Sequence, residues 1–275
     1  MNKKVLLLII GLASTVVLLF SFVIKGFVSQ KSARLVDKTK LENRASLLSL
    51  AGDYEKEKDY VKAREAFREF VGRFPGSKDA PRVEKDIENL NMKILFSRAM
   101  TSESFPYEIK KGDTLARIAS RFNTTTELIK KSNNLKSDLI LPGKNLKINK
   151  IKFNILVNKT DNTLALCNDG GEIVKMYRVS TGKNFSTPTG TFKVEEKLPS
   201  PVWYKVGAVI EPGSPEYELG TRWIGLSLAG YGIHGTKDPE SIGQYVTMGC
   251  IRMRNEDVEE LYAVVASGTV VEIVE

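Results

Sequence analysis

The chain has 275 residues, of which 42% are hydrophobic and 27% charged, a composition typical of a folded protein with one large domain or several small ones. Its formal net charge of +8 favours anionic surroundings, but no Lys/Arg run alternates with aromatic residues, so we predict no nucleic-acid partner. Two cysteines, one histidine and no Cys-x-x-Cys pair exclude a disulfide framework and a His-rich zinc site, and we predict no metal site. One disulfide remains possible.

The N-terminal segment is an uncharged, apolar run from Val5 to Ile24, preceded by Lys3 and Lys4. A helix that spans a membrane needs about 20 apolar residues, so we predict a signal-anchor helix over 1–24, single-pass in the cytoplasmic membrane, and a polar linker over 25–40. A cleaved signal peptide is the alternative, but its apolar core usually has roughly 7–15 residues, and no small-x-small cleavage site follows here. Because positive residues tend to stay cytoplasmic, both interpretations predict that the remaining domains are exported.

Residues 41–100 have a helical period and predict an all-α segment. Two apolar stripes are separated by a break at Lys58-Asp59, Pro75-Gly76 ends the second helix, and a third is expected from Asp79 to about Arg98. The stripes contain Leu47, Leu50, Ala51, Tyr54, Ala63, Ala66, Phe67, Phe70 and Phe74. Their spacing resembles one tetratricopeptide repeat, although such repeats normally need about three copies. A helical spacer, a peptide-binding or protein-docking element and a dimerisation element remain alternatives.

The next segment, Tyr107 to Ile148, predicts a small β-α-α-β unit. A short alternating strand leads into Gly112-Asp113-Thr114, and an amphipathic helix follows. Thr124-Thr125-Thr126 caps a second helix, Asn133-Asn134 ends it, and a Pro-Gly turn precedes the returning strand. A unit of about 40 residues is near the size at which a domain needs extra support.

This unit resembles a LysM domain over 107–149. The residues that carry the resemblance are Tyr107, Gly112, Asp113, Thr114, Leu115, Ile118, Ala119, Asn133, Gly143, Leu146 and Ile148. The resemblance implies binding to glycans that contain N-acetylglucosamine, chiefly peptidoglycan. It assigns the glycan contacts to two loops, here Gly112–Thr114 and Leu139–Pro142, with Gly112, Asp113, Thr114, Ile140 and Leu141 as the expected contact residues. Leu115, Ile118 and Ala119 are expected to fold the unit.

From Phe153 the pattern has period two, which predicts a mostly-β domain over 152–275. "FNILVN" and "TLALCN" flank "KTDN" as a hairpin, and "DGGE" turns into the strand "IVKMYRV". The run "VVASGTVVEIV" from Val264 to Val274 reads as a closing strand because it is rich in β-branched residues. One short helix is expected over Asn255–Ala263, with Asn255 as its cap.

The only histidine, His234, and Cys250 are both flanked by glycine in "HGTKDPESIGQYVTMGCIRM". A thiol needs a base to become a nucleophile, because free cysteine has a pKa near 8.5, and a neighbouring imidazole is such a base. Gly249 permits a tight turn in which the backbone N–H groups of Gly249 and Cys250 form an oxyanion hole. Arg252 is expected beside the thiol, where its planar guanidinium suits a substrate carboxylate.

The chain order separates classes of cysteine enzyme. In papain-type enzymes, and in NlpC/P60 peptidases, the nucleophile precedes its histidine, and no histidine follows Cys250 here. Cys167 ends a predicted strand beside a turn, has no nearby base, and is interpreted as structural or incidental.

The segment from Phe153 to Val274 resembles the L,D-transpeptidase catalytic domain, whose signature is HG, a spacer and [ST]-x-G-C-[IV]-[RN]. This chain supplies His234-Gly235 and Thr247 to Arg252, with Met248 where many members have a second histidine. "STPTGTF" (186–192), "LGTRWIGL" (219–226) and "SIGQ" (241–244) match further elements. The resemblance implies a multidomain, exported cell-wall enzyme that acts on peptidoglycan stems and needs no cofactor.

The resemblance further implies that Cys250 attacks the third stem residue, releases D-alanine and passes the acyl group to an amine, giving a 3→3 cross-link. It makes His234 the general base, gives the Gly235 carbonyl the role of orienting its ring, and assigns substrate contacts to Arg252, Trp223 and Thr247. It also implies acylation by carbapenems. Alternatives are an L,D-carboxypeptidase, a lipoprotein-anchoring transpeptidase, and a non-catalytic peptidoglycan-binding scaffold, which a Cys167–Cys250 disulfide would favour.

Overall fold

The structure, a computed structural model, describes residues 43–205 and 208–275. The membrane helix expected over 1–24 and the linker expected over 25–40 lie outside the described residues. Within the described part of the chain, no helix is both long enough and apolar enough to cross a membrane. The chain divides into two units, and the boundary falls between Ala80 and Pro81.

The first unit contains a helix over 43–56 and helix α2 (Tyr60–Arg73). The two helices are separated at Lys58, whose φ of 61° lies in the left-handed region. Asp59 then caps α2, because its carboxylate accepts a hydrogen bond from Lys62 N at 3.2 Å. The buried face of α2 consists of the expected residues Ala63, Ala66, Phe67 and Phe70. The predicted break and the predicted second stripe are both confirmed.

Helix α3 (Ala80–Leu95) falls almost entirely in the second unit, so the predicted helical segment over 41–100 does not form one domain. It runs beside strand β5 (Ile173–Arg178), where the Asn91 side-chain amide donates to Val174 O at 3.0 Å. Met92 and Leu95 join the core of the C-terminal domain. The physical reason for this placement is that β5 is the last strand of its sheet. Its outer backbone N–H and C=O groups have no neighbouring strand, and side chains of α3 provide hydrogen-bond partners for some of them.

The predicted β-α-α-β unit is confirmed. Strands β1 (Ser104–Glu108) and β2 (Asn145–Asn149) pair antiparallel, with helices α4 (Leu115–Phe122) and α5 (Thr126–Asn133) between them in sequence. Thr114 and Thr125 cap the two helices, accepting hydrogen bonds from the backbone N–H groups of Arg117 and Leu128 at 3.2 and 2.9 Å. These bonds satisfy donors that have no partner inside each helix.

This small unit is fixed to α3 by Lys147, a buried lysine on β2. Its Nζ donates to the carbonyl oxygens of Ile94 and Ser97 at 2.8 and 2.9 Å, at the C-terminal end of α3. Burial lowers the pKa of Lys147 to about 8. A cation at the end of a helix is stabilised by the unpaired carbonyls and the helix dipole there.

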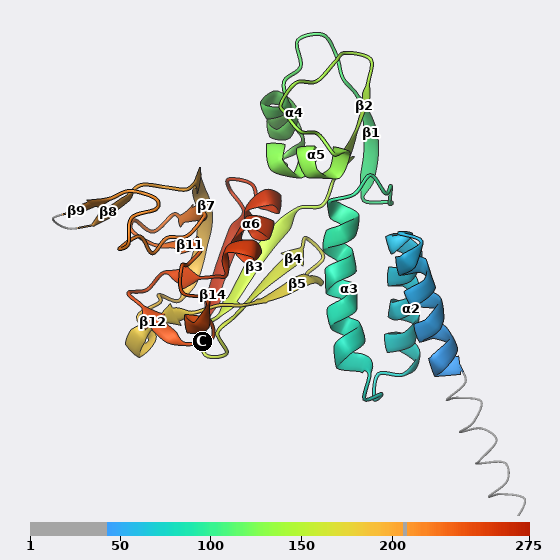
Figure 1. Cartoon of the computed structure of the whole chain (residues 1–275), viewed down its shortest axis with the longest axis horizontal. Helices are drawn as coiled ribbons and strands as arrows, with labels where there is room; N and C mark the ends of the chain where they lie inside the picture. The colour runs from blue at the N-terminus through green and yellow to red at the C-terminus, as the bar shows by residue number, and fades with distance from the viewer. Residues whose placement is uncertain (1–42, 206–207) are drawn as a thin grey trace, which may run out of the picture. The chain divides into compact units, whose positions relative to one another are not determined.

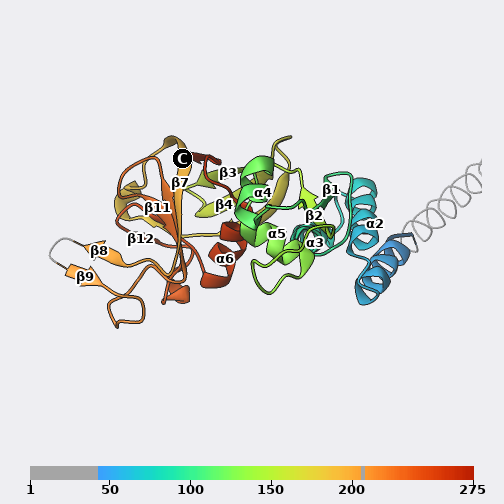
Figure 2. The ribbon, with the colours of Figure 1, turned by 90° about the horizontal axis from the view of Figure 1, so that it is seen from above.

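The C-terminal domain contains an eight-stranded sheet in the order β13-β11-β10-β7-β14-β3-β4-β5 (Figure 1). Strand β14 pairs antiparallel with β7 and parallel with β3, so the end of the chain lies inside the sheet. Two short pairs, β6–β12 and β8–β9, stand apart from it, and β8 and β9 extend outward in both views (Figure 1, Figure 2). The strands are β3 (Phe153–Asn158), β4 (Thr163–Asn168), β6 (Thr181–Gly182), β7 (Gly190–Pro199), β8 (Trp203–Lys205), β9 (Ala208–Ile210), β10 (Arg222–Leu226), β11 (Gly232–His234), β12 (Tyr245–Thr247), β13 (Ile251–Arg252) and β14 (Val270–Val274), with 3-10 turns η1 (Lys183–Phe185) and η2 (Pro239–Ser241).

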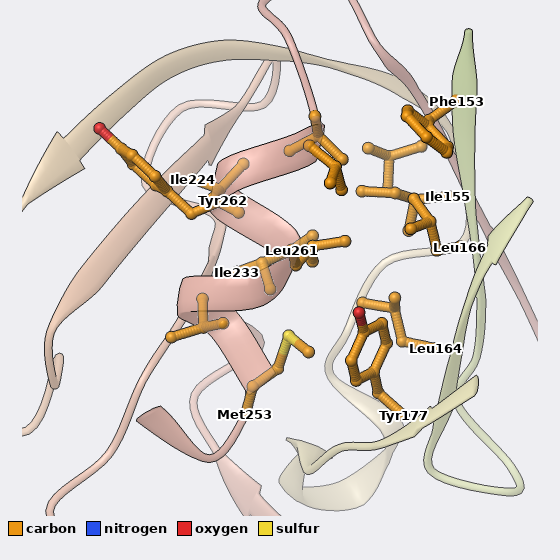
Figure 3. Packing of buried hydrophobic residues seen from close by; sticks show 14 of the residues in the cluster. Phe153, Ile155, Leu164, Leu166, Tyr177, Ile224, Ile233, Met253, Leu261 and Tyr262 are labelled. Carbon is orange, nitrogen blue, oxygen red and sulfur yellow. The ribbon is translucent and has the colours of Figure 1, made fainter. Parts of the chain in front are cut away.

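The core of this domain lies between the sheet and helix α6 (Asn255–Val264). Figure 3 shows Leu261 projecting from α6 among the side chains of Ile224 and Ile233, with Leu164 and Tyr177 on the opposite side. Fully burying one such aliphatic side chain contributes about 1.5–3 kcal/mol. The sheet and α6 therefore form the rigid part of the domain, from which the loops at its β13 edge project.

The predicted closing strand over 264–274 is wrong at its start. Helix α6 continues to Val264, and β14 begins only at Val270. Val264 and Val265 are buried at the end of the helix, and Gly268, with φ 88°, makes the turn into the strand. Burial in the core outweighed the β preference of this valine pair. The predicted β3–β4 hairpin and the strand after it are confirmed.

Candidate active site

A cleft of about 540 Å³ opens at the β13 edge of the sheet. Five side chains expected at the site line it together: His234, Cys250, Arg252, Trp223 and Thr247. The short parallel pair β11–β13 accounts for this, because it places His234 opposite Arg252 and Ile233 opposite Ile251. Cys250 directly precedes β13, so the thiol lies at the start of the strand that pairs with the strand of the imidazole.

His234 ends β11 and is 4% exposed. Its Nδ1 lies 2.7 Å from the carbonyl oxygen of Gly235. A carbonyl oxygen only accepts, so Nδ1 carries the proton and Nε2 is the free, basic nitrogen. The pKa of His234 is lowered to about 4, mainly by burial and to a smaller extent by the nearby Arg252 charge, while the hydrogen bond to the Gly235 carbonyl acts in the opposite direction. The imidazole is therefore a neutral base at neutral pH.

Cys250 is half-buried, and its thiol donates to the carbonyl oxygen of Gly230, with Sγ and O 3.7 Å apart. Burial raises the pKa of this thiol, and the backbone N–H of Gly232 and the charge of Arg252 offset that effect only in part. The resting site thus holds a neutral thiol and a neutral imidazole in one cleft. Such a pair reacts by general-base catalysis, in which the imidazole removes the thiol proton as the sulfur attacks.

The turn that carries the thiol is held by Thr247. Its hydroxyl donates to Cys250 O at 2.7 Å and accepts from Gly249 N at 3.1 Å. The structure thereby gives Thr247 a bracing role, with its hydroxyl directed into the turn. Of the two N–H groups expected in an oxyanion hole, that of Gly249 is engaged by Thr247, whereas no hydrogen bond is recorded for Cys250 N in the described part of the chain.

Gly249 has a φ of 129°, and a Cβ placed on it would lie 2.6 Å from Cε1 of Tyr231. Both the conformation and the lack of space require glycine there. The predicted element 186–192 packs beneath this turn: the buried Thr187 hydroxyl donates to Gly249 O at 2.9 Å and accepts from Gly182 N at 2.8 Å. The position of the thiol therefore depends on a segment about 60 residues earlier in the chain.

Arg252 and Trp223 occupy opposite sides of His234. The Arg252 guanidinium contacts Ser241 Oγ at 3.2 Å and Glu218 Oε2 at 3.3 Å. Its Nε is buried and has no hydrogen-bond partner among the described residues. The indole of Trp223 stacks beside the imidazole, with ring centroids 5.9 Å apart and planes 21° apart. These two side chains fix the position of the imidazole and keep one positive charge in the cleft.

Asn255 has a role that the sequence did not indicate. We expected it to cap α6, but Arg254 is the cap residue and Asn255 is the first residue of the helix. Its amide oxygen accepts from Thr221 N at 3.1 Å and Thr236 N at 3.2 Å, and its amide nitrogen donates to Thr236 O at 2.9 Å. It therefore ties the loop before β10 to the loop that follows His234.

Replacing Asn255 with alanine is expected to destabilise the domain by about 2–4 kcal/mol, because two backbone N–H groups and one carbonyl lose their partner. Both tryptophans, Trp203 and Trp223, lie in this domain, so denaturant unfolding followed by their fluorescence reports on it alone. The exposed Glu256→Ala is the matched control and is expected to change stability by less than about 0.5 kcal/mol. Equal midpoints for the two variants would contradict this role.

The side chains expected to contact glycan have different structural roles. The Asp113 carboxylate accepts from Tyr107 OH at 2.7 Å and Lys110 N at 2.9 Å, and Thr114 caps α4, so both side chains stabilise the first loop. Gly112 turns that loop with φ 87°. Ile140 packs against the core of the small unit, whereas Leu141 is 58% exposed. Leu139, which begins the same expected loop, is 77% exposed.

Cys167 and Cys250 are both free thiols, so no disulfide links them. Burial raises the pKa of Cys167, as expected for a structural cysteine. Among residues 43–205 and 208–275, no group of three or more His, Cys, Asp or Glu side chains is arranged to hold a metal ion.

Comparison with known families and proteins agrees with these features. The family model described as YkuD, L,D-transpeptidase catalytic domain, matches residues 152–273, and the LysM domain model matches residues 107–149. The Bacillus licheniformis protein named L,D-transpeptidase YkuD is 36% identical over 175 residues, which are 61% of this chain and 97% of that protein. YqjB of Bacillus subtilis, also named an L,D-transpeptidase, is 43% identical over 121 residues, 42% of this chain and 67% of that protein. A solved L,D-transpeptidase from Mycobacterium smegmatis aligns with a TM-score of 0.40 at 24% identity, over 50% of this chain and 65% of that chain.

Proposed function

Because the chain belongs to the YkuD family of L,D-transpeptidases and contains a LysM domain, we propose that it cross-links peptidoglycan stem peptides through a thioester on Cys250. The observation that carries this mechanism is the placement of Cys250 and His234 in one cleft, with the Gly235 carbonyl holding the proton on Nδ1 of the imidazole. That arrangement leaves Nε2 as the base for the thiol. No metal or organic cofactor enters the proposed reaction.

In the first step, Nε2 of His234 takes the thiol proton as Sγ of Cys250 attacks the carbonyl carbon of the third stem residue. The imidazolium then donates that proton to the departing nitrogen of D-alanine, and the acyl group remains on sulfur as a thioester. In the second step an amine of another stem attacks the thioester. His234 removes a proton from that amine and returns one to the sulfur, which leaves a new peptide bond and a free thiol.

The developing oxyanion needs hydrogen-bond donors. The backbone N–H of Cys250 has no hydrogen-bond partner among residues 43–205 and 208–275, and we assign it the principal role in the oxyanion hole. The N–H of Gly249 contributes only after it leaves Thr247 Oγ1. Losing one such donor typically lowers the rate about 100- to 1,000-fold. Arg252 keeps Glu218 and Ser241 in place and carries the cleft's positive charge beside the thiol.

The LysM domain supplies the proposed second activity, binding of N-acetylglucosamine-containing glycan through the loops at 112–114 and 139–142. Leu139 and Leu141 expose apolar surface on the second loop, which suits contact with the apolar face of a sugar ring. Holding glycan on the same chain raises the local concentration of stems at the active site. We propose that the described domains lie outside the cytoplasm, in the periplasm or cell wall, where peptidoglycan is found, and the signal-anchor over 1–24 remains a prediction.

The proposal is tested by incubating the purified full-length chain with tetrapeptide-bearing peptidoglycan fragments and identifying the products by mass spectrometry. Dimers that have lost one D-alanine, absent with both Cys250→Ala and His234→Ala, are expected. Tripeptide monomers alone would indicate an L,D-carboxypeptidase, and stems joined to an added lipoprotein lysine would indicate a wall-anchoring enzyme. No product, and no acylation of Cys250 by a carbapenem, would leave a glycan-binding scaffold, although the free cysteines already disfavour that reading.

A further inference from the structure

One face of the sheet edge forms the wall of the cleft. Strand pairing sets Leu198 of β7 opposite Trp223 of β10, Trp223 opposite His234 of β11, and His234 opposite Arg252 of β13. All four line the cleft, and so does Glu196, two residues before Leu198 on β7. Because residues two apart in a strand share a face, Glu196 belongs to the same wall.

Two glycines, Gly225 and Gly232, leave space on this wall because they have no side chains. Glu196 pairs with Gly225, and Gly225 pairs with Gly232. A Cβ on Gly232 would lie 2.6 Å from two indole carbons of Trp223, and a Cβ on Gly225 would lie 2.9 Å from its Nε1. The indole therefore rests directly on these strands where a side chain would otherwise stand, and Nε1 donates to Glu196 Oε1 at 3.0 Å.

The charges around the cleft do not balance. It contains two carboxylates, Glu196 and Glu218, and one guanidinium, Arg252. Glu218 forms an ion pair with Arg252 at 3.3 Å, whereas Glu196 has only the Trp223 N–H and no ion pair with a described side chain. His234 and Cys250 are neutral in the resting state. One negative charge thus remains in the cleft of a protein whose net charge is +8, and it lies at Glu196.

We propose that Glu196 and the indole of Trp223 together bind the primary ammonium of a diamino-acid side chain in the stem peptide. The carboxylate supplies a charge-assisted hydrogen bond, and the indole supplies an electron-rich face for the cation. This selects cationic stems over stems whose side-chain amine is blocked. The proposal rests on the proposed function, since the ammonium belongs to a substrate of Cys250.

The ammonium has two sources. It belongs either to the donor stem, whose third-residue side chain is free while its carbonyl reacts, or to the acceptor stem, whose amine waits to attack the thioester. In the donor case Glu196 acts before D-alanine leaves. In the acceptor case Glu196 changes only the fraction of the thioester that reacts with the amine rather than with water. The two cases are therefore separated by which product responds.

The experiment compares the full-length chain with Glu196→Gln, which keeps the size of the side chain and removes its charge. Glu195→Gln is the matched control, since Glu195 is an exposed neighbour on β7 that does not line the cleft. Each protein receives tetrapeptide stems with a free or an N-acetylated side-chain amine, and D-alanine release and dimer formation are measured separately. Alkylation of Cys250 by iodoacetamide, a neutral reagent, shows whether each variant keeps an intact thiol site.

For the donor source, Glu196→Gln is expected to raise KM for the free-amine stem about tenfold or more and to leave the N-acetylated stem unchanged. For the acceptor source, D-alanine release stays constant while the ratio of dimer to hydrolysed tripeptide falls about tenfold. Either result supports the proposal, provided that alkylation and the Glu195→Gln control match the wild type. An active wild type whose stem preference and dimer ratio are unaltered by Glu196→Gln overturns it and leaves the proposed function standing. A wild type that releases no D-alanine from either stem overturns both.

Discussion

Replacing His234 with glutamine is expected to lower D-alanine release from a stem tetrapeptide about 100- to 10,000-fold, the usual contribution of a general base. The reason is that His234 is the single imidazole of the chain and burial raises the pKa of the Cys250 thiol, so little thiolate exists at neutral pH without proton removal in the reaction itself. His234 performs that removal because its pKa is lowered to about 4, which keeps Nε2 unprotonated. Single-turnover release of D-alanine, resolved by mass spectrometry, measures this loss.

The same neutral pair predicts the pH dependence of both reactions. Alkylation of Cys250 by iodoacetamide, followed on its own peptide to exclude Cys167, should rise continuously from about pH 6 to about pH 9. A raised thiol pKa means that thiolate forms only on the alkaline side. Activity should persist on the acid side until His234 is protonated near its pKa of about 4, well below the ordinary value for histidine. An alkylation rate that is flat between about pH 5 and pH 8 would instead show a thiolate–imidazolium pair.

Replacing Gly249 with alanine is expected to lower acylation of Cys250 at least about 100-fold and to destabilise the domain by about 2–5 kcal/mol. Alanine at φ 129° is strained, and its Cβ would lie 2.6 Å from Tyr231 Cε1. The turn must shift to relieve this contact, and the shift moves both the thiol and the N–H of Cys250. Acylation by a carbapenem and unfolding by denaturant measure the two effects.

Gly268→Ala separates this effect from backbone strain alone. Gly268 also has a positive φ, 88°, but a Cβ there would meet no atom within 4 Å, and the residue lies in the turn before β14. A cost of about 1 kcal/mol with unchanged acylation is expected for it. Removing the clash in a Gly249→Ala, Tyr231→Ala double variant should recover part of the stability. If Gly249→Ala retains wild-type acylation, the turn does not position the thiol as described.

Local sequence patterns predicted most of the elements. The period of the apolar residues, the breakers at 58–59 and 75–76, and the capping threonines gave α2, α4, α5 and the first hairpin of the sheet, because these elements depend on neighbours a few residues away. The valine pair at 264–265 was misread for the same reason. Its local preference favours a strand, but its burial at the end of α6 depends on side chains from the distant sheet.

The sequence by itself determined which residues we propose for the chemistry: a single imidazole and a glycine-flanked thiol, each recognisable from its immediate neighbours. Only the tertiary structure decided how they are supported. Thr187 holds the thiol turn from 62 residues away, Asn255 ties together two loops, and Glu196 meets Trp223 across two strands 27 residues apart. The partner of a polar side chain depends on strand register and burial, and both are set by the packing of the whole sheet. The local sequence "TFKVEEKLP" therefore does not show which of its two adjacent glutamates, Glu195 or Glu196, lines the cleft.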